Sequence, residues 1–401
     1  MGHAHFTRRT VVITSGVRTA IGTFGGALAG LAPTDLGALV VREALTRARV
    51  APGDVEHVVF GNVIVTESRD AYLGRTAAMG GGIPKEVPAM TLNRLCGSGV
   101  QAIISAAQSI MLGDADIAVA GGAECMSRAP HLLSAARFGQ RMGDVAAADH
   151  LTGILTDPFG NGIMGITAEN VADRYQVGRE EQDALALESQ RRAAAAIDAG
   201  RFRDQILPVE VRKEKESVLF DTDEHLKRDT KPEELAALRP VFRKGGSVTA
   251  GNSSGVNDGA AALVLVEEEK AQRDGLPILA RIAGYAHAGV DPSEMGIGPV
   301  PAVRRLLDRT GLRVEDFDVI ESNEAFAAQA CAVSRALGFD PAKVNPNGGA
   351  VALGHPVGAT GAILTVKALY ELHRIGGCRA LVTMCIGGGQ GIALALEIPA
   401  G

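Results

Sequence analysis

Two cysteines and one histidine stand where glycine-rich turns meet predicted helices or strands. Cys96 precedes a helix, His355 lies in Gly354-His-Pro-Val-Gly358, and Cys385 precedes Gly387-Gly-Gly. A thiol at a helix N-terminus faces unpaired backbone N–H groups, which favours the thiolate. A histidine can accept the thiol proton, and glycine amides can face a developing oxyanion. Together these residues predict catalysis by a nucleophilic thiol.

Each of these residues also has a structural interpretation. A lone cysteine is often a small buried apolar residue, and a histidine in a turn can simply bind backbone. Asn323 follows a predicted strand at 319–320 and opens a predicted helix, so it is a candidate helix N-cap. Ser253, in Gly251-Asn-Ser-Ser-Gly255, matches a hydrolase nucleophile motif, but that motif requires a helix afterwards. Residues 256–259 predict a turn instead, which disfavours the hydrolase.

The elements that would position these residues repeat along the chain. After Cys96, an apolar face at helical spacing runs from Val100 to Met111, and a strand at 117–120 ends at Gly121-Gly122. After His355, a helix at 362–370 precedes a strand at 381–384, which ends before Gly387. Helices that alternate with buried strands indicate an α/β fold. The repetition predicts two similar halves with chemistry at matching places.

Length and composition narrow the class of protein. The chain has 401 residues, 46% hydrophobic and 21% charged, with a net charge of −6, so a basic nucleic-acid binder is disfavoured. The 5 cysteines are widely spaced and odd in number, which favours reduced thiols and a cytoplasmic location. No apolar signal core follows the N-terminal arginines, and no unbroken apolar span is expected. No motif for a metal or for nucleotide hydrolysis is present.

A shift in composition predicts an inserted segment. The stretch from about 126 to 256 contains a charged helix (180–197) and a charge-dense run (212–231), and a buried strand then resumes at 261–266. We therefore expect an N-terminal half at 1–125 and 257–278, an insert at 126–256, and a C-terminal half at 279–401.

Taken together, these segments resemble the thiolase family along nearly the whole chain, and most closely its bacterial β-ketothiolases that condense short acyl-CoAs. The motifs that carry the resemblance are the stretches 18–26, 93–99, 121–124, 167–170, 248–252, 323–329, 347–349, 354–358 and 385–391. The resemblance implies a five-layer αβαβα core built from two similar halves, an inserted loop domain that binds coenzyme A, and a homotetramer. It leaves open whether the enzyme serves polyester or isoprenoid synthesis or fatty-acid degradation.

The resemblance also implies a ping-pong mechanism with no permanently bound cofactor and no metal. Cys96 would carry the acyl group after His355 has taken its proton, and Cys385 would exchange a proton with C2 of acetyl-CoA. One oxyanion site would use His355 and a water held by Asn323. The other would use the backbone N–H groups of Cys96 and Gly387. A condensing enzyme of the ketoacyl-synthase type would typically lack Cys385, and a non-catalytic acyl-CoA-binding relative should have lost one of Cys96, His355 and Cys385.

The resemblance assigns coenzyme A contacts across the insert and the C-terminal half. The matching residues are Met164, Phe242, Ala250, Ser254, Ala325 and Phe326, with Lys227, Arg228, Arg243 and Lys244 as candidate phosphate-binding cations. Three departures are Ile163 where relatives often have His, Lys227 where many have Arg, and Cys125 where Ser is common. Ile163 would affect the preference for the acyl chain, and Lys227 would weaken phosphate binding because lysine lacks the bidentate fork of arginine. Cys125 would add a thiol near the pocket.

Overall fold

The computed structural model describes residues 9–213 and 216–399, so the sequence start (1–8), residues 214–215 of the charged run and the last two residues lie outside the described residues. The N-terminal half comprises strands β1 (Val11–Thr19), β2 (Gly22–Thr23), β3 (His57–Gly61), β4 (Ala89–Leu92), β5 (Ile117–Cys125) and β11 (Asn257–Glu267), with helices α1 (Pro33–Ala48), α2 (Leu73–Gly80), α3 (Ser98–Leu112) and α8 (Glu268–Arg273).

The C-terminal half comprises strands β12 (Ala280–Gly289), β13 (Val319–Ser322), β14 (Arg379–Ile386) and β15 (Gln390–Glu397), with helices α9 (Pro299–Thr310), α10 (Ala327–Leu337), α11 (Ala350–Leu353) and α12 (Thr360–Ile375). Between β5 and β11 lie strands β6 (His131–Leu132), β7 (Ala148–Asp149), β8 (Ile206–Leu207), β9 (Val209–Lys213) and β10 (Glu216–Phe220), and helices α4 (His150–Ile154), α5 (Met164–Arg174), α6 (Arg179–Asp198) and α7 (Pro232–Ala237).

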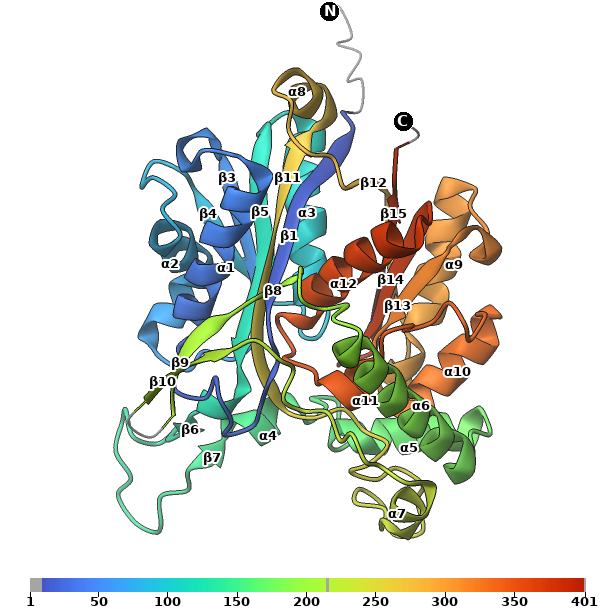
Figure 1. The fold of residues 1–401 in the computed structure, drawn as a ribbon. Helices are drawn as coiled ribbons and strands as arrows, with labels where there is room; N and C mark the ends of the chain where they lie inside the picture. The colour runs from blue at the N-terminus through green and yellow to red at the C-terminus, as the bar shows by residue number, and fades with distance from the viewer. Residues whose placement is uncertain (1–8, 214–215, 400–401) are drawn as a thin grey trace, which may run out of the picture.

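The elements stack in the predicted α-β-α-β-α order (Figure 1). Helices α1 and α2 cover the outer face of the N-terminal strands, and α9 and α10 cover the outer side of the C-terminal strands. Helices α3 and α12 lie between the two groups of strands and contact each other as well as strands of both halves. The middle layer therefore brings the starts of α3 and α12, which follow Cys96 and His355, to the centre of the molecule.

Strand order confirms that the two halves are similar. The N-terminal strands follow the order β1-β11-β5-β3-β4, and the C-terminal strands follow β12-β15-β14-β13 with matching parallel and antiparallel pairings. A parallel bridge between Ile320 and Val344 occupies the place that β4 holds in the first half. A short antiparallel ladder between β1 and β12 joins the halves into one sheet.

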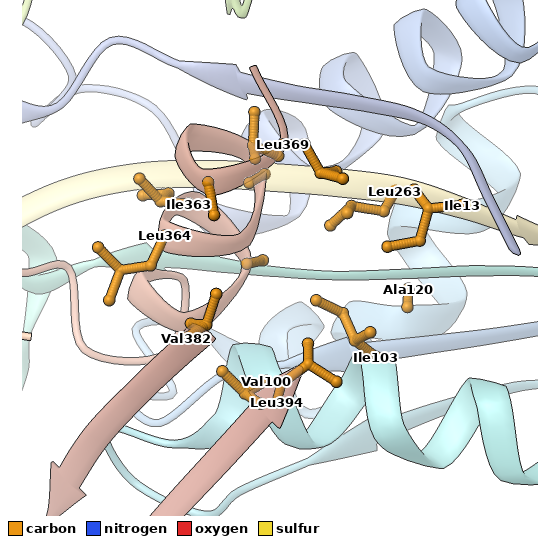
Figure 2. Packing of buried hydrophobic residues seen from close by; sticks show 14 of the residues in the cluster. Ile13, Val100, Ile103, Ala120, Leu263, Ile363, Leu364, Leu369, Val382 and Leu394 are labelled. Atoms are coloured by element: carbon orange, nitrogen blue, oxygen red, sulfur yellow. The ribbon is translucent and has the colours of Figure 1, made fainter. Parts of the chain in front are cut away.

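The middle layer forms the largest apolar cluster, because α3 and α12 bury aliphatic side chains on both sides (Figure 2). Ile103 of α3 and Ile363 of α12 pack with Leu263 of β11 and Val382 of β14. Burying one such side chain contributes about 1.5–3 kcal/mol. Within the described residues, one stretch (Leu95–Leu112) is long and apolar enough to span a membrane, but most of it is buried here as a core helix.

Three local predictions are wrong. Strand β5 does not end at Gly121-Gly122, because both glycines lie inside it; a Cβ on Gly122 would meet the Gly358 oxygen at 2.3 Å, so close backbone contact requires glycine there. Residues 257–259 are not a turn but the start of β11, although a strand after Ser253 still excludes the hydrolase. Asn323 is not a helix N-cap, since α10 begins four residues later.

Candidate active site

Cys96, His355 and Cys385 line one cavity of about 270 Å³, together with Gly387. The first two come from the turns before α3 and α12, and Cys385 from the end of β14. Residues separated by nearly 300 positions in the chain therefore share one wall. The predicted meeting of two thiols and an imidazole is present in the structure.

Two glycines let the turns that carry Cys96 and His355 approach each other. A Cβ on Gly99 would lie 2.4 Å from the Ala362 nitrogen, and one on Gly361 would lie 2.4 Å from the Val100 nitrogen. Such distances are shorter than any real Cβ contact, so the first turns of α3 and α12 meet backbone to backbone. Any side chain here would push the two helix starts apart, and with them Cys96 and His355.

Cys96 sits in a tight turn with its own hydrogen bonds. Leu95 adopts a left-handed conformation (φ 46°), and its N–H donates to the Asn93 side chain at 2.8 Å. The Ser98 hydroxyl accepts from the Arg94 N–H at 2.9 Å and donates to the Leu95 carbonyl at 2.7 Å. The strained turn therefore holds Cys96 at the cavity wall, and the hydrogen bonds offset the cost of the left-handed residue.

Burial raises the pKa of the Cys96 thiol, while hydrogen bonds from the backbone amides of Gly387 and of Cys96 itself lower it. The backbone N–H groups act in the predicted direction, but loss of water outweighs the two amides and the net pKa of Cys96 is raised. The same two amides are those predicted to bind an oxyanion, and they converge on the sulfur. Cys96 therefore needs a base.

The hydrogen bonds of His355 define which ring nitrogen can act as that base. The Thr360 hydroxyl donates to the Pro356 carbonyl at 2.8 Å, so its oxygen must accept from Nδ1–H of His355 at 2.6 Å. Nε2 then carries a lone pair, and the Asn323 amide nitrogen lies 3.5 Å from it. Burial lowers the pKa of His355 to about 4, so the imidazole is neutral at pH 7.

Two asparagines fix the surroundings of His355. Asn257 accepts from the His355 backbone N–H at 2.9 Å and donates to the Gly22 carbonyl at 3.0 Å. Asn323 is buried, and its Oδ1 has no hydrogen-bond partner among the described residues. Asn323 thus contacts the imidazole of His355 without lining the cavity, and it keeps one polar atom available.

Cys385 lies in a more apolar part of the same cavity. It is buried at the end of β14, packed with Met164, Met295 and Ala325. Its Sγ lies 3.8 Å from Oε1 of Gln329, which the thiol faces as a donor. Burial and the neighbouring Cys96 both raise the pKa of Cys385.

Glu124 was quoted in a motif but given no role by sequence reasoning. It is buried at the end of β5, and its two carboxylate oxygens accept N–H groups of residues 62–64 and of Gly358 at 2.9–3.1 Å. The carboxylate therefore ties the loop after β3 to the loop that carries His355. The sequence could not show that four donors meet this side chain, since three of them are backbone N–H groups.

The predicted coenzyme A contacts divide between two cavities. Five of them, Met164, Phe242, Ser254, Ala325 and Phe326, line the catalytic cavity together with Ile163. Lys227, Arg228 and Ala250 line a second cavity of about 720 Å³. The segment 250–255 contributes to both, so it links the catalytic centre to the charged insert.

The predicted phosphate-binding cations are not equivalent. Arg228 pairs with Asp198 at 2.8 Å, and Arg243 pairs with Asp173 at 2.8 Å. In the described part of the chain, the ammonium groups of Lys227 and Lys244 form no ion pair. These two lysines are therefore the more available partners for an anion.

Comparison with known proteins decides the family. The model for the thiolase N-terminal domain matches residues 11–269, and that for the thiolase C-terminal domain matches residues 276–398. The chain belongs to the thiolase family. Beta-ketothiolase BktB of Cupriavidus necator is 63% identical, over 97% of this chain and 99% of that protein. An acetyl-CoA acetyltransferase of Pseudomonas aeruginosa is 53% identical, over 96% and 98%.

Solved structures agree with the fold of this thiolase. The human mitochondrial 3-ketoacyl-CoA thiolase in complex with CoA has a TM-score of 0.95 and 45% identity, covering 98% of each chain. The Bacillus anthracis acetyl-CoA acetyltransferase has a TM-score of 0.95 and 48% identity, over 97% of this chain and 99% of that one. The predicted five-layer fold and the predicted acyltransferase class are confirmed.

Cys125 lies next to Met126, which lines the catalytic cavity, so its thiol is near the pocket as expected. Cys125 itself, however, does not line the cavity. It is buried, its Sγ lies 3.8 Å from the Leu28 carbonyl, and burial raises its pKa. A buried, protonated thiol is a structural residue, so Cys125 adds no reactive group to the site.

Proposed function

We propose that this thiolase condenses two short acyl-CoAs to a 3-oxoacyl-CoA and free coenzyme A, and catalyses the reverse thiolysis, through an acyl group on Cys96. The observation that carries the proposal is the single cavity lined by two thiols and a neutral imidazole. One thiol cannot be acylated and act as the base at the same time, so the second thiol gives each step its own group. CoA thioesters are therefore the substrate class.

In the first half-reaction, His355 Nε2 takes the Cys96 proton and the sulfur attacks the thioester carbonyl. The carbon–sulfur bond to coenzyme A breaks, and the departing CoA thiolate takes the proton of Cys385. Cys96 is then acylated, His355 is protonated and Cys385 is a thiolate. Amides of Cys96 and Gly387 meet the negative charge on the carbonyl oxygen in a site shielded from water.

In the second half-reaction, the Cys385 thiolate takes a proton from C2 of the second acyl-CoA. The carbanion attacks the acyl carbon on Cys96, and the Cys96 sulfur leaves and recovers its proton from His355. Every group returns to its starting state, so the cycle consumes two acyl-CoAs and releases one product and one coenzyme A. No residue other than the three on the cavity wall needs to move a proton.

The shape of the cavity supports short acyl groups. Around Cys96 the cavity of about 270 Å³ is lined by the apolar residues Val63, Met126, Ile154 and Val357. Segment 250–255 connects it to the cavity with Lys227, where the anionic end of coenzyme A would lie. An acyl chain of two to four carbons suits the small apolar lining next to Cys96.

Initial rates of thiolysis test this proposal. Acetoacetyl-CoA and 3-oxovaleryl-CoA, each with free coenzyme A, should both be cleaved, and the acyl group should appear on the Cys96 peptide by mass spectrometry. Inertness towards both substrates would refute the short-chain activity. Lys227→Ala should raise KM for coenzyme A without changing kcat, and Arg228→Ala, whose guanidinium is already paired, serves as the comparison.

A cytoplasmic homotetramer completes the proposal. The loop between β6 and β7 exposes large apolar side chains, Phe138 (94% exposed) and Met142 (88% exposed), which favours an interface with another copy. All 5 cysteines are free thiols, as expected for a reducing compartment. Light scattering should give four times the chain mass, and Phe138→Ser with Met142→Ser should reduce it. A monomer in the unmodified protein would refute the assembly.

A further inference from the structure

Gln329 is the polar side chain that contacts Cys385 directly. It is the third residue of α10 and is fully buried. Its Oε1 lies 3.8 Å from Cys385 Sγ, within the reach of a thiol hydrogen bond. The catalytic steps above do not use it, and sequence reasoning gave it no role.

Backbone groups fix which end of the Gln329 amide faces the thiol. Oε1 accepts the N–H of Ala325 at 3.1 Å and lies 3.5 Å from the N–H of Phe326. A backbone N–H can only donate, so the amide cannot flip without leaving the buried Ala325 N–H and the part-buried Phe326 N–H unpaired. Nε2 is left without a partner among the described residues. The buried amide N–H₂ group of Gln329 thus stays unpaired while its carbonyl oxygen faces the sulfur.

An acceptor beside a sulfur stabilises the thiol and repels the thiolate. The S–H group can donate to Oε1, whereas a negative sulfur would face a partial negative charge. The other titratable groups on the same cavity wall are Cys96 and His355, and the remaining neighbours, such as Met164 and Met295, carry no charge. Burial and Cys96 act in the same direction, since both raise the pKa of Cys385.

We propose that Gln329 is a positioning residue for the acid–base step: its carbonyl oxygen holds the proton of the resting Cys385 thiol. Cys385 then stays protonated until the CoA thiolate leaves, and its thiolate keeps a high affinity for the C2 proton. In thiolysis the same hydrogen bond keeps Cys385 available as the acid. The catalytic meaning rests on the proposed function, but the hydrogen bond itself can be tested without any turnover.

The test is the pH dependence of alkylation of Cys385 by iodoacetamide, followed peptide by peptide so that Cys96 is resolved separately. Gln329→Leu removes the acceptor and should lower the midpoint by about one pH unit. Gln329→Glu keeps an oxygen towards both backbone donors and adds negative charge, so it should raise the midpoint. The Cys96 midpoint should change by less in both variants. Gln108→Leu, a glutamine on α3 that contacts Tyr285 outside the cavity, should leave both midpoints unchanged.

A purely structural role for Gln329 as a cap of α10 would lower the melting temperature of Gln329→Leu and move neither midpoint. An unchanged Cys385 midpoint in folded Gln329→Leu therefore overturns the proposal. If that variant does not fold, Gln329→Glu decides alone, and the absence of an upward shift overturns it. Loss of condensation in Cys385→Ser reports on the proposed function separately, so the two failures are distinguishable.

Discussion

The two thiols of the cavity have the same chemistry but opposite surroundings. Cys96 faces donors, the amides of Gly387 and of its own residue, and lines the same cavity as the neutral imidazole of His355. Cys385 faces an acceptor, the carbonyl oxygen of Gln329, and two methionines. Donors stabilise a sulfur or an oxygen that becomes negative, while an acceptor stabilises a sulfur that holds a proton. In the proposed function, hydrogen-bond polarity rather than residue type therefore distinguishes the nucleophile from the acid–base group.

Replacing each cysteine separately gives the largest expected contrast. Cys96→Ser should abolish acylation and turnover, by about a thousandfold or more, because a neutral hydroxyl is a far weaker nucleophile than a thiolate. Cys385→Ser should still release one coenzyme A per active site from acetyl-CoA, although more slowly because the departing thiolate loses its proton donor, and it should lose condensation and the exchange of C2 hydrogen for deuterium. Rapid-quench mass spectrometry and NMR measure the two steps.

Cys378→Ser provides the control for these variants, because Cys378 is exposed and lies outside the cavity. It should retain full activity in both assays. If Cys385→Ser also lost acylation, or Cys96→Ser kept C2 exchange and condensation alike, the division of roles between the two sulfurs would be wrong.

The neutrality of His355 should appear in the pH dependence of stability. Burial lowers the pKa of its imidazole to about 4, against about 6.5 in an unfolded chain. The unfolded state therefore binds more protons between these values, and the contribution is complete above pH 6.5 and lost as the pH falls to 4. Its size is about 3 kcal/mol. Urea unfolding of the protein and of His355→Asn at several pH values isolates it.

The matched control is His131→Asn, because His131 is exposed on the short strand β6. This variant should keep the full pH dependence, whereas His355→Asn should lose about 3 kcal/mol of it. Parallel curves for all three proteins would show that His355 titrates normally, and would remove the argument that Cys96 has a neutral base.

Thr360 should affect the Cys96 side of the comparison alone. Thr360→Val removes the acceptor of His355 Nδ1–H, so the base loses the partner that fixes its tautomer. The loss of one such hydrogen bond is worth about a tenfold decrease in the acylation rate. Thr365→Val, on the same helix with its hydroxyl bonded to the Gly361 carbonyl, is the control. Equal effects of the two variants would indicate a general loss of helix packing instead.

Which site residues could be predicted from the sequence depends on whether their interactions are local in the chain. Cys96, His355 and Cys385 could be predicted because glycines stand next to them or within two or three residues of them in the chain. The partners that give each thiol its role, Gln329 and Thr360, could not, since their contacts depend on how distant elements meet. The turn predicted for residues 257–259 was wrong for the same reason. Their composition is typical of a turn, but Asn257 lies in a strand, and its side chain hydrogen-bonds to the backbone of His355 and Gly22.

Strand and helix positions, by contrast, were predicted well where burial is continuous. The apolar face from Val100 to Met111 gave α3 within two residues, because packing in the middle layer selects one face at helical spacing. The predicted end of a strand was wrong where a glycine permits close backbone packing instead of forming a turn, as at Gly122 in β5. A glycine can therefore mark either a turn or a close backbone contact, and only the tertiary structure shows which of the two applies.

The preference for acyl-chain length gives the smallest expected effect. It depends on the residues that pack against Cys96. Met126 is buried beside Val63 and Val357 in the cluster that packs against Cys96. Met126→Ala should open space where the acyl group attached to Cys96 lies, and raise kcat/KM for a six-carbon 3-oxoacyl-CoA over a four-carbon one by about fivefold. Met142→Ala, 88% exposed in the loop between β6 and β7, should leave the ratio unchanged.

Because a buried Met→Ala change can cost about 2–5 kcal/mol of stability, the rates should be measured well below the melting temperature. An unchanged ratio in folded Met126→Ala would show that the acyl chain does not lie beside Met126. It would then contradict the proposal that the acyl group on Cys96 occupies this part of the cavity.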